Sequence, residues 1–428
     1  MNHISRKLFA STGAAALLAT TVLAGAAATA VAQDEVEFDV YTLIHLDPGK
    51  SFIEGVAADY MAANPGVTVN LEILENEALK DKIAFETAAD NPPDVFHSWG
   101  GGTLAEQVDA GLVRGIDEEI ADVVDDVIPA GLSMTNVDGV QYGLPYALGA
   151  VGLWYNQDLL AEAGIDAPAT TWEEFLEDVQ TLKDAGITPI SLAGQDIWTE
   201  MFWFAYLAVR NCGPEGMSTA ITTGDWSGEC FIKSGEDLLR LVEMEPFQEG
   251  FLAANHDAQQ GEFGNGRAAF MLQGQWAPGS SASNSESGEG IGDALGWASF
   301  PAVEGGAGQL TDVFGGGDNF VVGRDAPPEA VDFLEYLTTN PDVVEAWAGL
   351  GDGTLPTHVG SEAFVADPNL QSILTDRWAA RFAQGYLVQV TSLALGAAIN
   401  DAVAGLVAGV LSPEELAQAI TDAAALEG

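Results

Sequence analysis

Three of the ten tryptophans, Trp99, Trp198 and Trp276, stand in polar or glycine-rich surroundings and not in apolar runs. Ten tryptophans are also more than a hydrophobic core of this size needs. An indole face flanked by carboxylate and amide side chains binds a ligand that has apolar faces and hydroxyl edges. These three indoles are therefore candidates for a ligand-binding site.

Some of the polar residues that could complete such a site follow expected strands, and ligands of open α/β sheets lie beyond the carboxyl ends of the strands. The candidates along the chain are His45, Glu75, Asn76, His97, Tyr146, Asp318 and Asn319. The last two follow the triple glycine 315–317, which could also suggest a phosphate cradle. No Lys or Arg stands near that glycine run in sequence, and Asp318 would repel phosphate, so we discount the phosphate reading.

The elements that must position these residues alternate between strand and helix. The hydrophobic pattern predicts strands over 38–44, 67–73 and 94–96, with helices over 51–64 and 77–89 between them. Asn64-Pro65-Gly66 ends the first helix, because proline disfavours helix in the residue before it. This rhythm predicts a parallel sheet and an α/β fold.

Later segments carry clear helix starts. Thr170 or Thr171 can cap a helix over 172–185, prolines open another over 327–337, and Ser412 caps the last one. The Gly/Ser/Glu-rich stretch 278–290 is expected to be a flexible surface loop. We find no internal repeat.

The charge of the chain excludes some partners. Lys and Arg number 14 against 64 Asp and Glu, which gives a net charge of −50. Nucleic acid and anionic membranes are repelled by such a surface, because binding them requires clustered Lys and Arg. The acidity fits either simple solubility or a saline habitat, and composition does not choose between them.

The N-terminal 32 residues resemble a secretory signal peptide, with Arg6 and Lys7 before an apolar stretch and Ala30-Val31-Ala32 as the cleavage pattern. We expect a periplasmic or secreted protein without a lipid anchor, because no cysteine follows the cleavage pattern. In such a compartment, Cys212 and Cys230 are expected to form one disulfide that closes a Gly/Thr/Ser-rich loop. No zinc-binding spacing is present, so neither a metal nor a cofactor is expected.

A series of short motifs gives the sequence a family resemblance. Leu153-Trp154-Tyr155-Asn156-Gln157-Asp158 and the run Gly266 to Trp276 are similar to segments of the extracellular solute-binding proteins that serve sugar ABC importers. The other matching segments, in the same order as in the family, are 64–69, 92–96, 142–146, 159–165, 171–175, 186–190, 315–322 and 355–357. Each motif is weak alone, but the ordered series covers nearly the whole mature chain.

The resemblance implies a periplasmic-binding-protein fold with two lobes, an interlobe ligand cleft and several hinge crossings, near 140–146, 305–312 and 348–355. Lobe one would hold 34–142 and 308–347, and lobe two 143–307 and 348–428. It further implies that Trp276 stacks on the ligand, that Tyr146 lies beside a crossing, and that the rim loops carry His45, Glu75 and Asn76. A monomer would bind a neutral mono- or oligosaccharide and deliver it to ABC permease subunits, without catalysis.

Two other classes of function stay open at this point. A binding protein for a polyamine, a peptide or glycerol-phosphate would keep the same fold, although the few arginines disfavour anionic ligands. An exported glycoside hydrolase would need two carboxyl groups at a fixed separation, and no local motif singles out such a pair among the 64 acidic residues.

Overall fold

The computed structural model describes residues 35–427, so the predicted signal peptide 1–32 lies outside the described residues. The first sheet has five strands in the order β2-β1-β3-β12-β6. β1, β2 and β3 run parallel, whereas β12 is antiparallel to both β3 and β6. The strands of this sheet are β1 Val36–Thr42, β2 Val67–Ile73, β3 Val95–Ser98, β6 Gly143–Leu148 and β12 Gly317–Val322.

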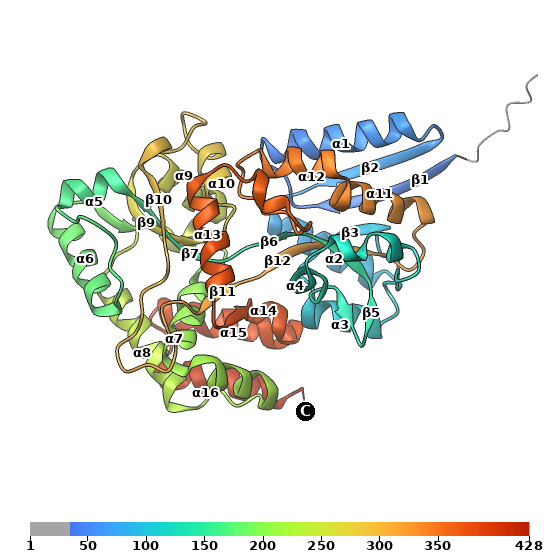
Figure 1. Cartoon of the computed structure of the whole chain (residues 1–428). Coiled ribbons are helices and arrows are strands. Elements are labelled where there is room, and N and C mark those ends of the chain that lie inside the picture. The colour runs from blue at the N-terminus through green and yellow to red at the C-terminus, as the bar shows by residue number, and fades with distance from the viewer. Residues whose placement is uncertain (1–34, 428) are drawn as a thin grey trace, which may run out of the picture. The chain divides into compact units, whose positions relative to one another are not determined.

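Helix α1 packs on this sheet through an apolar stripe. In α1 the buried residues Ile53, Val56, Ala57 and Tyr60 recur at spacings of three and four, which places them on one helical face. Figure 1 shows the late helices α11 and α12 beside α1, and α1 contacts both of them. The helices of this part are α1 Gly49–Ala63, α2 Asn76–Ala88, α3 Gly101–Asp109, α4 Pro129–Leu132, α11 Pro328–Thr339 and α12 Pro341–Ala348; the short strands β4 Asn136–Val137 and β5 Val140–Gln141 and the 3-10 turns η1 Ile120–Asp122 and η2 Val124–Asp126 complete it.

The second sheet has four strands in the order β10-β7-β9-β8. Its strands are β7 Gly152–Asn156, β8 Thr188–Ile190, β9 Ala268–Gln273 and β10 Leu295–Ala298, and a separate parallel pair joins β11 Val313–Gly315 to β13 Ala383–Gly385. The helices here are α5 Gln157–Ala163, α6 Trp172–Asp184, α7 Trp198–Thr223, α8 Glu229–Glu243, α9 His256–Gly264, α10 Ala277–Ser283, α13 Pro368–Ala379, α15 Leu393–Val407 and α16 Pro413–Ala425, with 3-10 turns η3 Phe251–Ala253 and η4 Gly292–Ala294. The 3-10 turn η5 Ser361–Phe364 contacts α12, and the short helix α14 Leu387–Val390 contacts both α3 and α15.

The fold is therefore α/β with two lobes, as the sequence predicted. Below, lobe one means the five-stranded sheet with the helices packed on it, and lobe two means the four-stranded sheet with its helices (Figure 1). The chain leaves the first sheet after Leu148 and re-enters it at Gly317. The predicted lobes, 34–142 with 308–347 and 143–307 with 348–428, remain a prediction about which segments move together.

Local sequence signals placed the starts of α6 and α16. Thr171 caps α6 by accepting a hydrogen bond from the Glu174 amide at 3.4 Å, and Ser412 forms a capping box with Glu415 at the start of α16. The prediction of a surface loop over 278–290 was wrong in its first part, because α10 occupies Ala277–Ser283. Proline at the start of a helix is tolerated, and the small serines that follow leave room for the helix to pack against α9.

The predicted disulfide between Cys212 and Cys230 is present. The expectation that it closes a loop was wrong, since Cys212 lies in α7 and Cys230 in α8. α7 continues past the cysteine after a kink at Gly213, whose φ of 65° is a left-handed conformation that glycine tolerates. The bond thus joins two packed helices.

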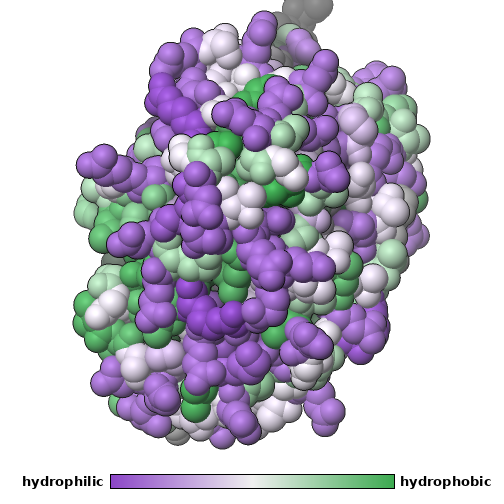
Figure 2. Space-filling view, turned by 90° about the vertical axis from the view of Figure 1, so that its left-hand side faces the viewer, coloured by the Kyte–Doolittle hydropathy of each residue, from purple (hydrophilic) through white to green (hydrophobic). Residues whose placement is uncertain are grey.

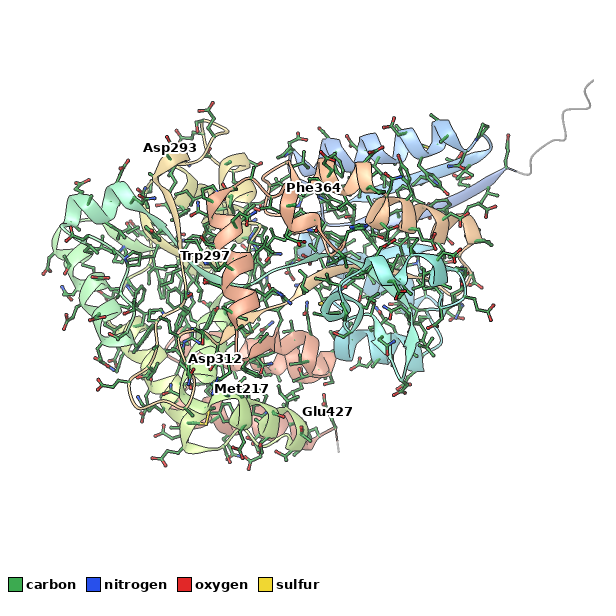
Figure 3. All side chains as sticks on the ribbon, viewed as in Figure 1. Met217, Asp293, Trp297, Asp312, Phe364 and Glu427 are labelled. Atoms are coloured by element: carbon green, nitrogen blue, oxygen red, sulfur yellow. A yellow bond between two sulfur atoms is a disulfide. The ribbon has the colours of Figure 1, made fainter. Side chains whose placement is uncertain are left out.

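A buried arginine organises the centre of lobe two. Arg210 is fully buried and donates to the carbonyls of Phe300, Pro301 and Asp312, the last at 2.6 Å from Nη1. Figure 3 labels Asp312 in this region, where its carboxylate accepts from Arg381 at 2.7 Å. The face of the molecule in Figure 2 is mostly hydrophilic, as expected for a chain with this excess of acidic residues.

Candidate functional site

The carboxyl ends of the parallel strands of lobe one carry four of the predicted site residues. His45 follows β1, Glu75 follows β2, and His97 and Trp99 lie at the end of β3. Because these strands run in the same direction, the four residues gather at one edge of the sheet. Glu75 is also the N-cap of α2, since its carboxylate accepts from the Glu77 amide at 3.0 Å.

Trp99 is partly buried at this edge and is held by two neighbours. Its ring packs edge-on against His97, with 4.5 Å between ring centroids, and the Lys80 ammonium lies 5.4 Å from its centroid. Lys80 also contacts the Glu77 carboxylate at 2.7 Å, and Asn76 donates to that same carboxylate at 2.6 Å. The side chain of Asn76 is therefore engaged within α2.

Lobe two contributes two partly buried indoles, those of Trp198 and Trp276, whose ring centroids lie 6.4 Å apart. Trp276 is fixed by a hydrogen bond from its Nε1 to Gln273 at 3.0 Å. Its ring lies so close to Gly274 that a Cβ there would meet the indole at 2.2 Å, so only glycine leaves room for this conformation. Trp198 lies beside the imidazole of His256, with 5.5 Å between centroids.

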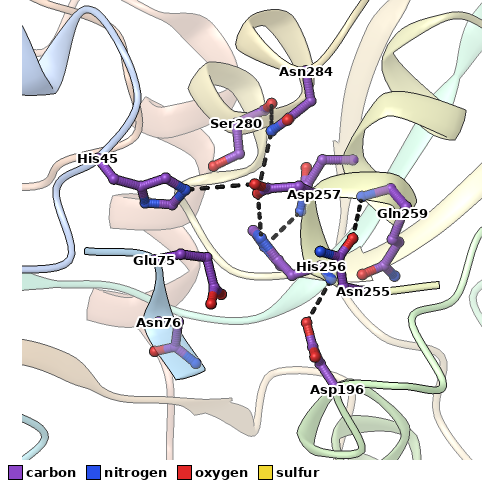
Figure 4. A network of polar contacts seen from close by, with 12 residues as sticks. His45, Glu75, Asn76, Asp196, Asn255, His256, Asp257, Gln259, Ser280 and Asn284 are labelled. Carbon is purple, nitrogen blue, oxygen red and sulfur yellow. Dashed lines mark hydrogen bonds and ion pairs between the residues drawn. The ribbon is translucent and has the colours of Figure 1, made fainter. Parts of the chain in front are cut away.

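An ionic contact joins the two lobes next to these residues. His45 Nε2 lies 3.6 Å from Asp257 Oδ2, and His256 Nδ1 lies 3.5 Å from Asp257 Oδ1, as Figure 4 shows. Burial lowers the pKa of His45, but its contact with Asp257 and its bond to a backbone carbonyl outweigh burial, so the pKa is raised. The two histidines hold the pKa of Asp257 well below its usual range.

Carboxylates from both lobes face one another in the same region. Asp196 accepts from the His256 amide at 2.6 Å. Burial raises the pKa of Asp196, and the negative charges of Glu77 and Glu75 on lobe one raise it further. Such acceptors suit a ligand that donates hydrogen bonds. Within residues 35–427, no group of three or more His, Cys, Asp or Glu is arranged to hold a metal ion.

A third group lies deeper, on the first sheet. The Tyr146 hydroxyl lies 3.3 Å from His97 Nδ1, and His97 Nε2 lies 3.5 Å from Asp318 Oδ1. Burial and the nearby Lys80 charge lower the pKa of His97 to about 3. Burial raises the pKa of Asp318 to about 7, while 19% of its side chain stays exposed.

Comparison with known proteins identifies the family to which this arrangement belongs. A family model described as bacterial extracellular solute-binding protein matches residues 45–344, well over half of the chain. The chain belongs to this family. A protein of Brucella abortus that is named as a binding protein is 27% identical over 224 residues, which cover 52% of this chain and 54% of the relative. The chain thus spans about half the length of that relative.

Two further relatives of this solute-binding protein carry names that state a ligand. The maltotriose-binding protein of Pyrococcus abyssi is 25% identical over 305 residues, 69% of this chain and 61% of the relative. The melibiose/raffinose/stachyose-binding protein of Bacillus subtilis is 25% identical over 166 residues, 37% of this chain and 36% of the relative.

Solved structures share the fold over nearly the whole chain. A structure from work on xylan utilisation by Caldanaerobius polysaccharolyticus has a TM-score of 0.84 and 25% identity, and the match covers 90% of this chain and 99% of the other. A chitin oligosaccharide binding protein has a TM-score of 0.84 and 24% identity, with 92% and 99% covered. The two-lobed fold of this solute-binding protein is therefore that of its family.

The structure brings most of the predicted site residues together, but not all in the predicted setting. Trp198 was expected in a loop and is instead the first residue of α7. Asn319 is fully buried within the sheet, where its side chain donates to the Ser98 carbonyl at 3.1 Å, so it braces β3 against β12. Trp99, Trp198 and Trp276 remain partly exposed. Contact with a ligand remains a prediction for all of these residues.

Three residues near this region were missed by sequence reasoning. Tyr386 stacks on Phe202 at 5.3 Å between centroids, and its hydroxyl has no hydrogen-bond partner among residues 35–427. No local pattern distinguishes Tyr386 in the sequence. His256 and Asp257 follow Asn255, which caps α9, so a helix-start signal beside two ionisable residues could have drawn attention to them.

The family is extracellular, which agrees with the prediction that the protein lies outside the cytoplasm. Across residues 35–427, every helix is too short or too polar to cross a bilayer.

Proposed function

We propose that this solute-binding protein binds a neutral carbohydrate, a mono- or oligosaccharide, between its lobes and delivers it to the permease of an ABC importer. The observation that carries the proposal is the set of indoles from both lobes, Trp99 on one side and Trp198 and Trp276 on the other, beside carboxylates. Indole faces suit the apolar faces of sugar rings, and carboxylates accept hydrogen bonds from hydroxyl groups.

The names of relatives support the same ligand class. Proteins named for binding maltotriose, for binding melibiose, raffinose and stachyose, and for binding chitin oligosaccharides share the family or the fold. We infer that the protein is exported by the segment 1–32, acts as a monomer outside the cytoplasmic membrane and performs no catalysis. Hinge motion of the two lobes would close the site on the sugar and present the closed form to the permease.

A thermal-shift screen followed by calorimetry tests this function. Maltotriose, raffinose, stachyose, xylotriose and chitotriose are each added to the purified mature chain. A ligand at 100 times its dissociation constant stabilises a protein by about 2.7 kcal/mol, which moves the melting temperature by several degrees. Spermidine and glycerol 3-phosphate are the comparison ligands. Stabilisation by spermidine together with no response to any sugar would contradict the proposal.

A further inference from the structure

Three adjacent strands of lobe one place Tyr146, His97 and Asp318 on one face of the sheet. β12 lies between β3 and β6, and His97 on β3 is directly opposite Phe320 on β12. Asp318 stands two residues before Phe320, so the two side chains share a face.

A β-bulge brings the third residue to this face. Asp318 pairs with Ala147 and Asn319 pairs with Pro145, so Tyr146 is the extra residue of β6 at the register shift. A bulge re-aims the side chain of the extra residue. Here it lets the Tyr146 hydroxyl reach His97 Nδ1, while its ring stacks on Trp347 at 5.2 Å and an interplanar angle of 9°.

The imidazole of His97 is enclosed and neutral. The side chain is 1% exposed, and the rings of Trp99, Tyr146 and Phe320 pack around it at centroid distances of 4.5, 5.9 and 6.3 Å. A neutral imidazole carries one N–H donor and one acceptor nitrogen. His97 Nε2 makes no hydrogen bond within residues 35–427, and the carboxylate of Asp318 is the charged group that faces it.

The neighbours select one tautomer. If Nδ1 carried the proton, the lone pair of Nε2 would face a carboxylate, and two acceptors would oppose each other. If Nε2 carries the proton, Tyr146 donates to Nδ1 and the Nε2–H bond points at Asp318. While Asp318 is ionised, above its pKa of about 7, the second arrangement is favoured because Nε2–H then points at a carboxylate 3.5 Å away and no two buried acceptors oppose each other.

We propose that Tyr146 and His97 are positioning residues of the binding site: the Tyr146 hydroxyl holds the tautomer that directs His97 Nε2–H at Asp318, and Asp318 accepts hydroxyl groups of the carbohydrate. His97 acts through Asp318, because its own side chain is fully buried in the ligand-free protein. The Asp318 side chain is 19% exposed, and its charge acts on Tyr386, which stacks on Phe202 of lobe two. The role of Asp318 rests on the proposed function, whereas the tautomer of His97 does not.

The contacts among Tyr146, His97 and Asp318 make sugar affinity depend on pH, because Asp318 can be protonated. The residues that face this carboxylate are Tyr146, His97 and Tyr386. Each of them also feels a charge from another element: Lys80 on α2 acts on His97, Asp352 after α12 acts on Tyr146, and Arg377 on α13 acts on Tyr386. A carboxylate accepts a stronger hydrogen bond than a carboxylic acid, so affinity should fall about fivefold as Asp318 is protonated. Loss of the His97 donor destabilises the carboxylate, which moves the midpoint of this fall to higher pH.

Nitrogen NMR of the imidazoles tests the tautomer in the ligand-free protein. The mature chain carries 15N-histidine, and His97→Gln identifies the resonances of His97. We expect an unprotonated Nδ1 and a protonated Nε2 in the wild type, and a mixture of tautomers in Tyr146→Phe. Tyr60→Phe is the matched control, since the Tyr60 hydroxyl donates to the Glu329 carbonyl at 3.1 Å in the core of the same lobe. A protonated Nδ1 in the wild type would overturn the proposal that Tyr146 holds the Nε2–H tautomer of His97.

Affinity measured from pH 5 to 9 tests the second half of the proposal. The probe is whichever sugar of the five-sugar panel gives the largest thermal shift. His97→Phe should raise the midpoint by about half a pH unit or more, and His97→Gln, which keeps an N–H donor, should restore most of the wild-type profile. An identical midpoint in the wild type and His97→Phe overturns the positioning role. A wild type that binds none of the five sugars contradicts the proposed function, while the NMR measurement still decides the tautomer.

Discussion

His45 on lobe one and Asp257 on lobe two form an ion pair across the lobes, with 3.6 Å between Nε2 and Oδ2. The pair is partly buried, since the two side chains are 23% and 30% exposed. His256 contacts the other carboxylate oxygen of Asp257, so this carboxylate contacts two imidazoles from different lobes. The contact gives the arrangement of the lobes a dependence on pH.

His45→Gln should remove this dependence. The raised pKa of His45 means that its contribution is fully present below the ordinary histidine value of 6.5 and is lost as pH rises through the folded-state pKa. The lowered pKa of Asp257 means that the contribution is also lost in strong acid. At pH 5.5 the free energy of unfolding of the wild type should exceed that of the variant by about 0.5–1 kcal/mol, and at pH 9 this difference should vanish.

Urea unfolding at the two pH values measures this difference. His358→Gln is the control, because the His358 imidazole bonds to the carbonyl of its own neighbour, Val359, at 2.9 Å. A constant difference between wild type and His45→Gln at both pH values would argue against the ion pair.

Glu200 makes the stability of lobe two fall as pH rises from about 4.5 to about 8. Both of its carboxylate oxygens lack a partner among residues 35–427, and burial raises its pKa from 4.5 to about 8. The folded protein therefore binds a proton that the unfolded chain releases, and stability falls by about 1.4 kcal/mol per pH unit between those two values. Glu200→Gln should flatten this fall, as measured by chemical denaturation at pH 5, 7 and 9. Glu236→Gln, at an exposed position on α8, should leave the slope unchanged.

Trp276→Ala should weaken sugar binding by roughly 1–3 kcal/mol and leave the fold intact, because a partly exposed indole contributes contact area more than core packing. Calorimetry with the sugar selected from the panel measures the loss. Trp297→Phe is the control: Trp297 donates to Asp376 on α13 at 3.1 Å, and its ring packs on Trp154 at 5.0 Å between centroids. Equal losses in both variants would show that the effect is not local to Trp276.

The excess of acidic residues predicts a response to salt. Removal of Arg6 and Lys7 with the segment 1–32 changes the net charge from −50 to −52. Repulsion between these carboxylates acts over about 30 Å at 0.01 M salt and about 3 Å at 1 M, so the melting temperature should climb with sodium chloride. Affinity for an uncharged sugar should change much less. A melting temperature that does not change with sodium chloride concentration would contradict the hypothesis that the acidity reflects a saline habitat.

Much of the fold follows from local patterns in the sequence. Period-two alternation over 67–73 gave β2, and side-chain caps at Thr171 and Ser412 gave the starts of α6 and α16 to within a residue. These signals work because backbone period and end-capping depend on residues only a few positions apart. The ordered motifs also sufficed to predict the family and the two-lobed architecture.

The tertiary structure alone decided how the site residues meet. Asp257 lies opposite His45 although 212 positions separate them in the sequence, and the bulge at Tyr146 exists only because β6 pairs with β12 in a shifted register. Asn319, which the sequence suggested as a ligand contact, is buried between strands, and its contact with a ligand stays a prediction. Strand register and the packing of one lobe on the other fix such contacts, and no local pattern of residue types encodes either of them.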